Sequence, residues 1–221
     1  MDEHDHYFTA APASADERRR LRVRLGGRTV EVEVAPGVFS PGGLDKGTAV
    51  LLDEAPPPPP AGTFLDLGCG WGPIALTLGL LSPAATVHAV DVNERALDLA
   101  RRNAAALGLA GVHPTTADGI PDAVRFDLIW SNPPIRVGKV VLHDLLRTWL
   151  PRLAPTGVAH LVVQKNLGSD SLQRWVEGDL GMPCARLATS RGFRVLEVRH
   201  SSGSTTIAEP PPRRDGSAAA T

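Results

Sequence analysis

The chain has 221 residues, of which 43% are hydrophobic and 21% are charged, and its 23 basic and 24 acidic residues give a formal net charge of −1. These values are ordinary for a globular protein and exclude one that binds nucleic acid through a strong overall positive charge, although they allow a local basic patch. The two cysteines, Cys69 and Cys184, lack the spacing of zinc ligands or a redox pair, which excludes a disulfide scaffold and a zinc cluster.

The ends of the chain and its apolar runs indicate where the protein works. Residues 1–6 are acidic and contain no apolar run of the kind found in a signal peptide. No stretch reaches the roughly 18 apolar residues that a membrane-spanning helix needs. We therefore expect a cytoplasmic protein that binds neither a membrane nor a metal ion.

Residues 1–60 are predicted to form an amino-terminal extension. Apolar and polar residues alternate over 21–25 and again over 30–34, and the two glycines between these runs are typical of a β-hairpin. A short helix is expected over 43–53. The proline run at 55–61 can form neither a helix nor a central strand and is expected to be an extended spacer.

Residues 61–200 alternate between strand and helix patterns, which predicts an α/β domain with a mostly parallel sheet covered on both faces. The last two strands follow one another directly, so an antiparallel hairpin at the sheet edge is expected. Residues 201–221 are rich in Ser, Gly, Pro and Ala and are expected to be a disordered tail. The predicted strands are 63–67, 86–90, 112–116, 126–130, 158–163, 185–189 and 193–198, and the predicted helices are 72–81, 94–107, 141–153 and 171–180.

A glycine-rich turn follows the first strand of this domain. Gly68-Cys69-Gly70 lets the backbone turn sharply and approach a ligand, and Cys69 is a small residue that fits the turn. A dinucleotide-binding turn has the pattern G-x-G-x-x-G. Here the third glycine, Gly72, comes one position early and Pro73 follows it, which disfavours a pyrophosphate site and a nicotinamide-dependent dehydrogenase.

Acidic residues lie at the ends of three neighbouring predicted strands. Asp66 precedes the glycines and suits an amine-bearing ligand. Asp91, followed by Val92 and Asn93 in the same site, can accept both hydroxyls of a ribose. Asp118-Gly119 can read the amino group of an adenine. An amine, a ribose and an adenine are the parts of S-adenosylmethionine, so we predict this molecule as the cofactor.

The fourth strand of the domain ends in Asn132-Pro133-Pro134-Ile135. The two prolines make a rigid corner, which holds the Pro133 carbonyl beside the Asn132 amide oxygen. Two fixed acceptors can grip the hydrogens of an exocyclic amine and leave its nitrogen lone pair aimed at a methyl donor. The sequence therefore predicts that these four residues form the catalytic corner of an N-methyltransferase, and Asn132 is also expected to contact the cofactor.

Together, the glycine turn and the Asn132 corner resemble the class I methyltransferases, which have a Rossmann-like sheet with an antiparallel last strand. The chain is most similar to the single-domain form of the small-subunit ribosomal RNA guanine-N2 methyltransferases. The similarity covers roughly residues 6–200. It rests further on three groups of residues: His6-Tyr7-Phe8, Gly37 to Ser40 with Leu44 to Thr48, and Val163-Gln164-Lys165. By this resemblance, Phe39, Asp45 and Thr48 belong to a segment that covers the donor site.

The resemblance implies that the substrate is guanine N2 of 16S ribosomal RNA, free or in the small ribosomal subunit. Arg136 and Lys139 follow the catalytic corner and are expected to contact this RNA. Members of the family usually have an aromatic residue after the two prolines, and here it is Ile135. The chain has no room for the second domain of the two-domain members, so we expect a monomer. The arginines over 18–24 fit either a phosphate-binding surface or a solvent-exposed strand face balanced by acidic residues.

Two alternatives remain at this point. The same corner could serve another amine, such as adenine N6, a protein glutamine or a small molecule. The chain could also bind the donor without catalysis, as a ribosome assembly factor. Intact Asp66, Asp91 and Asn132 argue against the second alternative.

Overall fold

The computed structural model describes residues 17–201. The two-stranded sheet of β1 (Arg19–Leu25) and β2 (Arg28–Val34) is the predicted amino-terminal hairpin, and residues 35–45 connect it to α1 (Lys46–Glu54). The proline run that follows lies outside helices and strands, as expected. The disordered tail expected over 201–221 lies outside the described residues except for Ser201, and the similarity at His6 to Phe8 also falls outside them.

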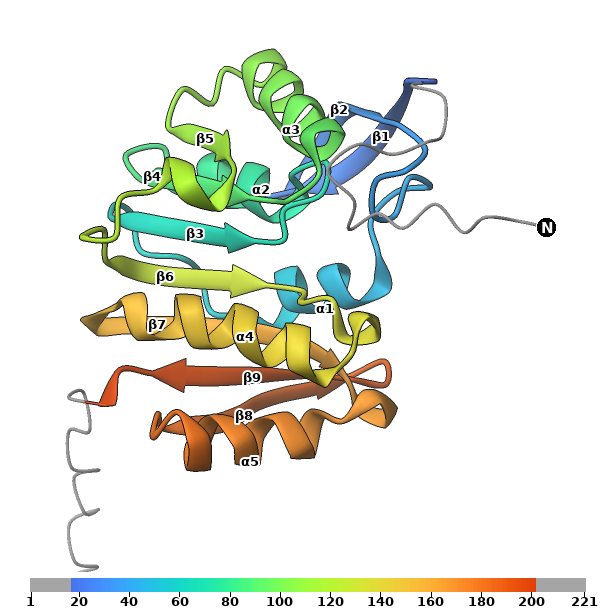
Figure 1. The fold of residues 1–221 in the computed structure, drawn as a ribbon. Coiled ribbons are helices and arrows are strands. Elements are labelled where there is room, and N and C mark those ends of the chain that lie inside the picture. The colour runs from blue at the N-terminus through green and yellow to red at the C-terminus, as the bar shows by residue number, and fades with distance from the viewer. Residues whose placement is uncertain (1–16, 202–221) are drawn as a thin grey trace, which may run out of the picture.

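A seven-stranded sheet forms the centre of the molecule (Figure 1), and its order is β5-β4-β3-β6-β7-β9-β8. All neighbours are parallel except that β9 runs antiparallel to both β7 and β8. This confirms the mostly parallel sheet, the antiparallel last strand and the edge hairpin. The strands are β3 (Thr63–Leu67), β4 (Thr86–Val90), β5 (Val112–Thr115), β6 (Phe126–Ser131), β7 (Leu153–Gln164), β8 (Cys184–Ser190) and β9 (Phe193–Arg199).

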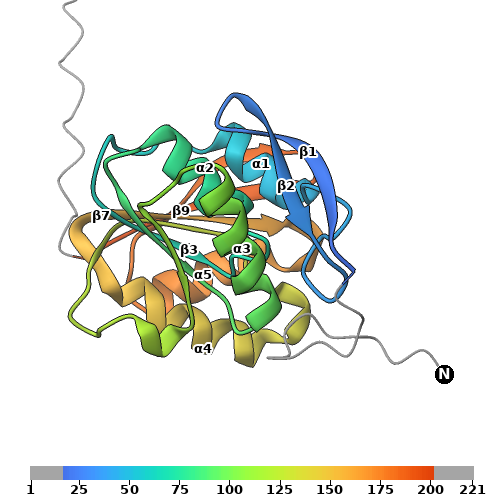
Figure 2. The same ribbon diagram turned by 90° about the horizontal axis from the view of Figure 1, so that it is seen from above.

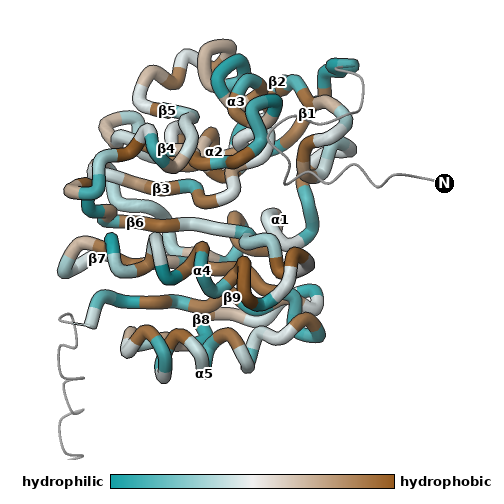
Figure 3. Tube along the Cα trace, in the orientation of Figure 1, coloured by the Kyte–Doolittle hydropathy of each residue, from teal (hydrophilic) through white to brown (hydrophobic). Residues whose placement is uncertain are grey.

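Helices cover both faces of the sheet, as the alternating pattern predicted. One apolar core joins the hairpin, α1, α2 (Pro73–Leu81) and α3 (Glu94–Ala106) to one face. A second core joins α4 (Lys139–Trp149) and α5 (Ser169–Asp179) to the other. Figure 2 shows α1 and α2 on the side of the sheet opposite α4. Apolar and polar residues alternate along α3, α4 and α5 in Figure 3, as expected of helices that bury one face.

The prediction was wrong where α4 meets β7. The helix expected over 141–153 begins at Lys139 and ends at Trp149. Pro151 has no amide hydrogen to continue the helical ladder, so a short 3₁₀ turn follows and β7 begins at Leu153, before the expected start at 158. Leu150 and Leu153 are nevertheless buried, and their apolar spacing imitates one more turn of helix.

None of the helices within residues 17–201 is long and apolar enough to cross a membrane. Over the same residues, no cluster of three or more His, Cys, Asp or Glu side chains could hold a metal ion.

Candidate functional site

A cavity of about 480 Å³ lies where the parallel strands end. Leu67 and Val90 line it from the last positions of β3 and β4, and Gln164 lines it from the end of β7. The antiparallel β9 contributes its first residue, Phe193. Ligands of open α/β sheets bind at this edge. The cavity is therefore the candidate functional site.

The glycine turn forms one wall of the cavity. Gly68 and Gly70 have φ angles of 81° and 54°, which side chains rarely adopt. The backbone amides of Gly68 and Cys69 donate to the carbonyl of Val90, at 2.8 and 2.9 Å. A carbon atom added to Gly68 would meet no described atom within 4 Å, so the backbone there faces open space. The turn thus leaves its backbone open to a ligand.

Asp91 ties the turn to the next strand. Its Oδ2 accepts from the Gly70 amide at 2.8 Å and its Oδ1 accepts from the Asn93 amide at 2.9 Å. Burial raises the pKa of this carboxyl, and the backbone hydrogen bonds oppose the rise. Asp91 lines the cavity. Each carboxylate oxygen can accept a second hydrogen bond, so Asp91 retains acceptor capacity for a ligand.

Asp66 lies beneath the first turn of α2 and does not line the cavity. The side chain is fully buried, and Oδ2 accepts from the Ala75 amide at 2.9 Å. Oδ1 is buried without a hydrogen-bond partner among the described residues. Burial raises the pKa of Asp66 to about 8, and the nearby Asp91 charge adds to the rise. Its proposed contact with a ligand amine stays a prediction.

This buried carboxyl should make folding stability depend on pH. The folded-state pKa of Asp66, about 8, lies above the ordinary value of 3.8, so the folded state holds a proton that the unfolded state releases. The stabilisation is complete below the unfolded pKa and is lost as pH rises through the folded pKa. Between pH 5 and pH 8 we expect the wild type to lose roughly 2–4 kcal/mol of unfolding free energy relative to Asp66→Asn.

Urea unfolding of both proteins at several pH values measures this difference. Asp118→Asn is the matched control, because Asp118 is exposed and its pKa is lowered, chiefly by the Thr116 hydroxyl. That control should follow the wild type over the same pH range. If the unfolding free energies of the wild type and Asp66→Asn changed in parallel between pH 5 and pH 8, the raised pKa of Asp66 would be contradicted.

The corner after β6 lies beside the glycine turn, because β3 and β6 are neighbouring strands, and all four predicted residues, Asn132 to Ile135, line the cavity. The Asn132 Nδ2 donates to Asp45 Oδ2 at 2.8 Å and to Thr48 Oγ1 at 3.1 Å. A carboxylate only accepts, so this pairing fixes which side of the amide is nitrogen. Asn132 Oδ1 has no hydrogen-bond partner within residues 17–201 and is left as an acceptor.

Asp45 connects this corner to the amino-terminal extension. It is the N-cap of α1, and its Oδ2 also accepts from the amides of Gly47 and Thr48, at 2.8 and 3.2 Å. One carboxylate oxygen therefore receives three donors. The sequence pattern Asp45-Lys46-Gly47-Thr48 is typical of a helix start. It gives no sign that the capping oxygen also holds Asn132.

Of the other predicted cofactor-binding residues, one lines the cavity and the rest lie outside its lining. Val92 lines the cavity and is 55% exposed. Asn93 is fully buried and does not line it, because its side chain caps α3 and donates to the carbonyl of Gly37. Asp118 and Gly119 also lie outside the lining, although the adjacent Ala117 belongs to it. Cys69 and Gly70 face a smaller neighbouring pocket together with Asn132.

The residues predicted to contact RNA follow the corner directly. Lys139 is the exposed first residue of α4, and the backbone of Arg136 lies in the short 3₁₀ turn before that helix. Several lining residues have no predicted role. Among them, Gln164 ends β7 and Phe193 begins β9. Phe39, which was predicted to belong to the segment that covers the donor site, also lines the cavity.

Comparisons with known proteins show which family this chain belongs to and which structures it resembles. A family model described as the methyltransferase small domain matches residues 29–197. The uncharacterized protein YbxB of Bacillus subtilis (strain 168) is 34% identical over 198 residues, which are 88% of this chain and 98% of that protein. Ribosomal RNA small subunit methyltransferase C of Pseudomonas aeruginosa (strain LESB58) is 37% identical over 199 residues. This alignment covers 86% of the chain but only 58% of that relative's length.

Among solved structures, the T. thermophilus 16S rRNA N2 G1207 methyltransferase (RsmC), in complex with AdoMet and guanosine, superposes with a TM-score of 0.72 and 26% identity. The match covers 86% of this chain and 52% of that one. TrmN from Thermus thermophilus gives a TM-score of 0.53 at 27% identity, over 70% of this chain and 48% of that one.

Proposed function

The chain belongs to the methyltransferase small domain family, and we propose that it transfers a methyl group from S-adenosylmethionine to guanine N2 of 16S ribosomal RNA. The observation that carries the proposal is the fixed Asn132 amide. Asp45 and Thr48 hold its nitrogen, and its oxygen remains free to accept inside the cavity. An amine held there lies in the same cavity as the glycine turn.

The glycine-turn side of the cavity fits S-adenosylmethionine. The backbone at Gly68 faces open space, as a close-fitting ligand requires. Asp91 can accept the ribose hydroxyls, and the apolar Val92, Ala96 and Ala117 line the cavity around it and can flank the adenine. The cofactor supplies an activated methyl group. The protein therefore needs to bring the amine nitrogen into line with that group.

The catalytic corner performs this alignment. Asn132 Oδ1 and the Pro133 carbonyl accept the two hydrogens of the guanine N2 amine, which turns the nitrogen lone pair toward the methyl group. The prolines keep the carbonyl from rotating away. No strong base is needed, because the nitrogen loses its proton after the new carbon–nitrogen bond has formed. Ile135 packs against the base, and Lys139 and Arg136 contact the RNA backbone.

The choice of guanine in ribosomal RNA is supported by the relatives. The curated relatives named ribosomal RNA small subunit methyltransferase C include the P. aeruginosa protein, and the T. thermophilus enzyme was solved with guanosine. The chain spans little more than half of either protein. The B. subtilis relative matches the present chain over nearly its whole length.

The direct test uses labelled S-adenosylmethionine and small ribosomal subunits from a strain that lacks this gene. We expect label in N2-methylguanosine after digestion of the RNA, and none with Asn132→Ala. Naked RNA from the same subunits, tested in parallel, identifies the physical form of the substrate. Label in N6-methyladenosine, in protein or in no ribosomal component would contradict the proposal.

Asp91 provides a separate prediction about the cofactor. Asp91→Ala removes the acceptor for the ribose hydroxyls and releases the amides of Gly70 and Asn93. We expect the Kd for S-adenosylmethionine to rise about tenfold, as the loss of a charge-assisted hydrogen bond predicts. Isothermal titration calorimetry measures it. Asp98→Ala, at an exposed ion pair on α3, is the control and should leave the Kd unchanged.

A further inference from the structure

The end of the β7–β9 pair presents an aromatic ring and an amide to the cavity, and neither has a role in the mechanism above. Gln164 and Phe193 are cross-strand partners, so their side chains lie next to each other on one face of the sheet. Both line the cavity and both are half-buried. No described residue hydrogen-bonds the Gln164 side chain. An unpaired amide beside an accessible ring is a pair of groups suited to a planar, polar ligand.

Phe193 also lies next to the catalytic corner. A carbon atom placed on Gly47 would be 3.0 Å from Phe193 Cε1 and 3.2 Å from Asn132 Nδ2. The ring edge and the amide therefore flank the same point at the start of α1. Phe193 therefore lies close to the Asn132 amide, the group to which the proposed function assigns the amine.

The ring is too far from the glycine-turn side to serve the cofactor's adenosine. Asp91 and Val92 follow β4, and β9 lies four strand positions from β4 in the sheet order. At about 4.8 Å per strand, the two positions are roughly 19 Å apart. An adenosine bound at Asp91 leaves Phe193 for a second ligand.

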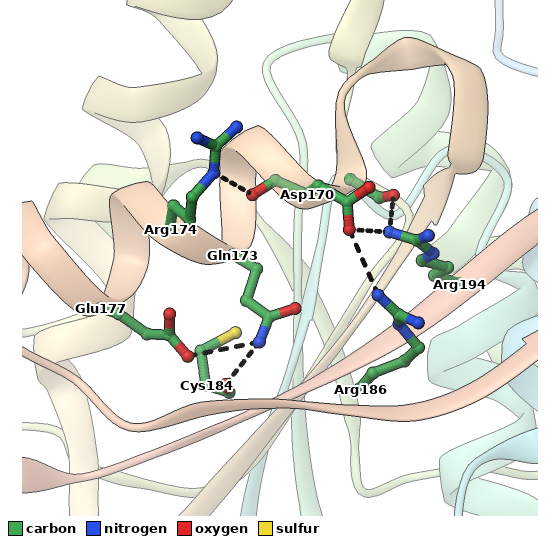
Figure 4. Close-up of polar contacts among 8 residues, drawn as sticks. Asp170, Gln173, Arg174, Glu177, Cys184, Arg186 and Arg194 are labelled. Atoms are coloured by element: carbon green, nitrogen blue, oxygen red, sulfur yellow. Dashed lines mark hydrogen bonds and ion pairs between the residues drawn. The ribbon is translucent and has the colours of Figure 1, made fainter.

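The start of β9 is held firmly in place. Arg194, the residue after Phe193, is buried and donates to Ser169 and Asp170 at the start of α5, and Arg186 of β8 also reaches Asp170 (Figure 4). On the β7 side, the Lys165 amide donates to the carbonyl of Gly192, the residue before Phe193, at 2.9 Å. A ring mounted on this strand keeps its position before a ligand arrives, which lowers the cost of binding.

From these placements we propose that Phe193 and Gln164 form the platform for the target base, with the ring packed on the base plane and the amide hydrogen-bonded to the base edge. This inference rests on the proposed function, because it names the contacts of the same substrate. Proteins that bind unpaired bases commonly stack them on aromatic side chains and read their edges with amides. Residue 135 is aliphatic, and Phe193 of β9 supplies an aromatic ring beside the corner.

The test compares Phe193→Leu, Phe193→Tyr and Gln164→Ala with the wild type in two assays. In the first, saturation-transfer NMR detects guanosine bound in the presence of S-adenosylhomocysteine. In the second, steady-state kinetics on small-subunit RNA give KM and kcat. Leu187→Ala is the control, because Leu187 is an exposed apolar residue on the neighbouring β8.

We expect the guanosine signal to disappear in Phe193→Leu and to persist in Phe193→Tyr. The KM for RNA should rise about tenfold in Phe193→Leu, with kcat and the Kd for S-adenosylhomocysteine within about twofold, because stacking binds ground and transition states alike. Gln164→Ala should weaken guanosine binding by about fivefold. The Leu187 variant should behave as wild type.

If both Phe193→Leu and Gln164→Ala kept the wild-type guanosine signal in NMR and the wild-type KM for RNA, the proposed platform would be wrong. It would also be wrong if the wild type did not bind guanosine. A wild type that binds guanosine but methylates no RNA would instead contradict the proposed function. A variant that fails to fold is recognised by circular dichroism, and the remaining variants then decide.

Discussion

Replacing Asn132 with alanine should lower kcat for methyl transfer about 10²–10³-fold, the usual cost of losing one preorganised polar group at a reacting centre. The variant keeps the Pro133 carbonyl but loses the acceptor that fixes the second amine hydrogen. The nitrogen can then rotate, and its lone pair no longer faces the methyl group. Single-turnover rates with labelled cofactor and small-subunit RNA measure the loss directly.

Cofactor affinity separates this role from a structural one. The Kd for S-adenosylmethionine should stay within about threefold in Asn132→Ala, because Asp91 and the glycine turn remain intact. Gln173→Ala is a matched control, since it removes an α5 side-chain amide that hydrogen-bonds the Cys184 carbonyl of β8, away from the cavity. It should keep normal kcat. If Asn132→Ala instead bound the cofactor poorly and turned over at the normal rate, Asn132 would be a cofactor ligand.

Local patterns predicted most of the fold. Strands 63–67 and 86–90 were predicted with their observed bounds, because each is a short, mostly apolar run that ends at a glycine or an aspartate, Gly68 and Asp91. The hairpin was predicted from alternation and two glycines, which have φ angles of 54° and 78° at Gly26 and Gly27. The exception came at Pro151. There, burial of Leu150 and Leu153 continues the apolar spacing after the helix has ended.

The sequence predicted the parts of the site that consist of residues adjacent in the chain. The glycine turn and the Asn132 corner are each contiguous in sequence, and Gly68 of the turn and all four residues of the corner line the cavity. The partner of Asn132 is 87 residues away in Asp45, and the Gln164–Phe193 pair depends on strand register. Such contacts arise when the sheet assembles, and no local pattern encodes them.

The sequence also did not predict which of the site's polar side chains are buried away from the cavity. Asp66 and Asp91 both follow from the same rule about strand ends, but only Asp91 lines the cavity. Asp66 is one residue before the end of β3, and its side chain is directed under α2, where it meets the Ala75 amide. Asn93 was predicted to bind the cofactor and proved to be a helix cap, a role typical of asparagine before a helix. A ligand contact for it stays a prediction.

Asp45→Ala should lower kcat about 10²-fold, because the Asn132 amide loses the carboxylate that fixes its nitrogen and can then turn its oxygen away from the amine. The same substitution removes the N-cap of α1 and should cost about 1 kcal/mol of stability. Single-turnover rates and urea unfolding measure the two effects separately. Asp45→Asn keeps a capping oxygen, so its stability should lie near that of the wild type.

A double-mutant cycle decides whether Asp45 acts through Asn132. If the only catalytic role of Asp45 is to orient that amide, Asp45→Ala should cause almost no further loss of kcat when Asn132 is already alanine. Independent roles would make the two losses multiply. Thr48→Val, which removes the second acceptor of the Asn132 Nδ2 at 3.1 Å, should give a smaller loss of the same kind. Because Asp45 and Thr48 both belong to the start of α1, a positive cycle would mean that the amino-terminal extension completes the catalytic corner.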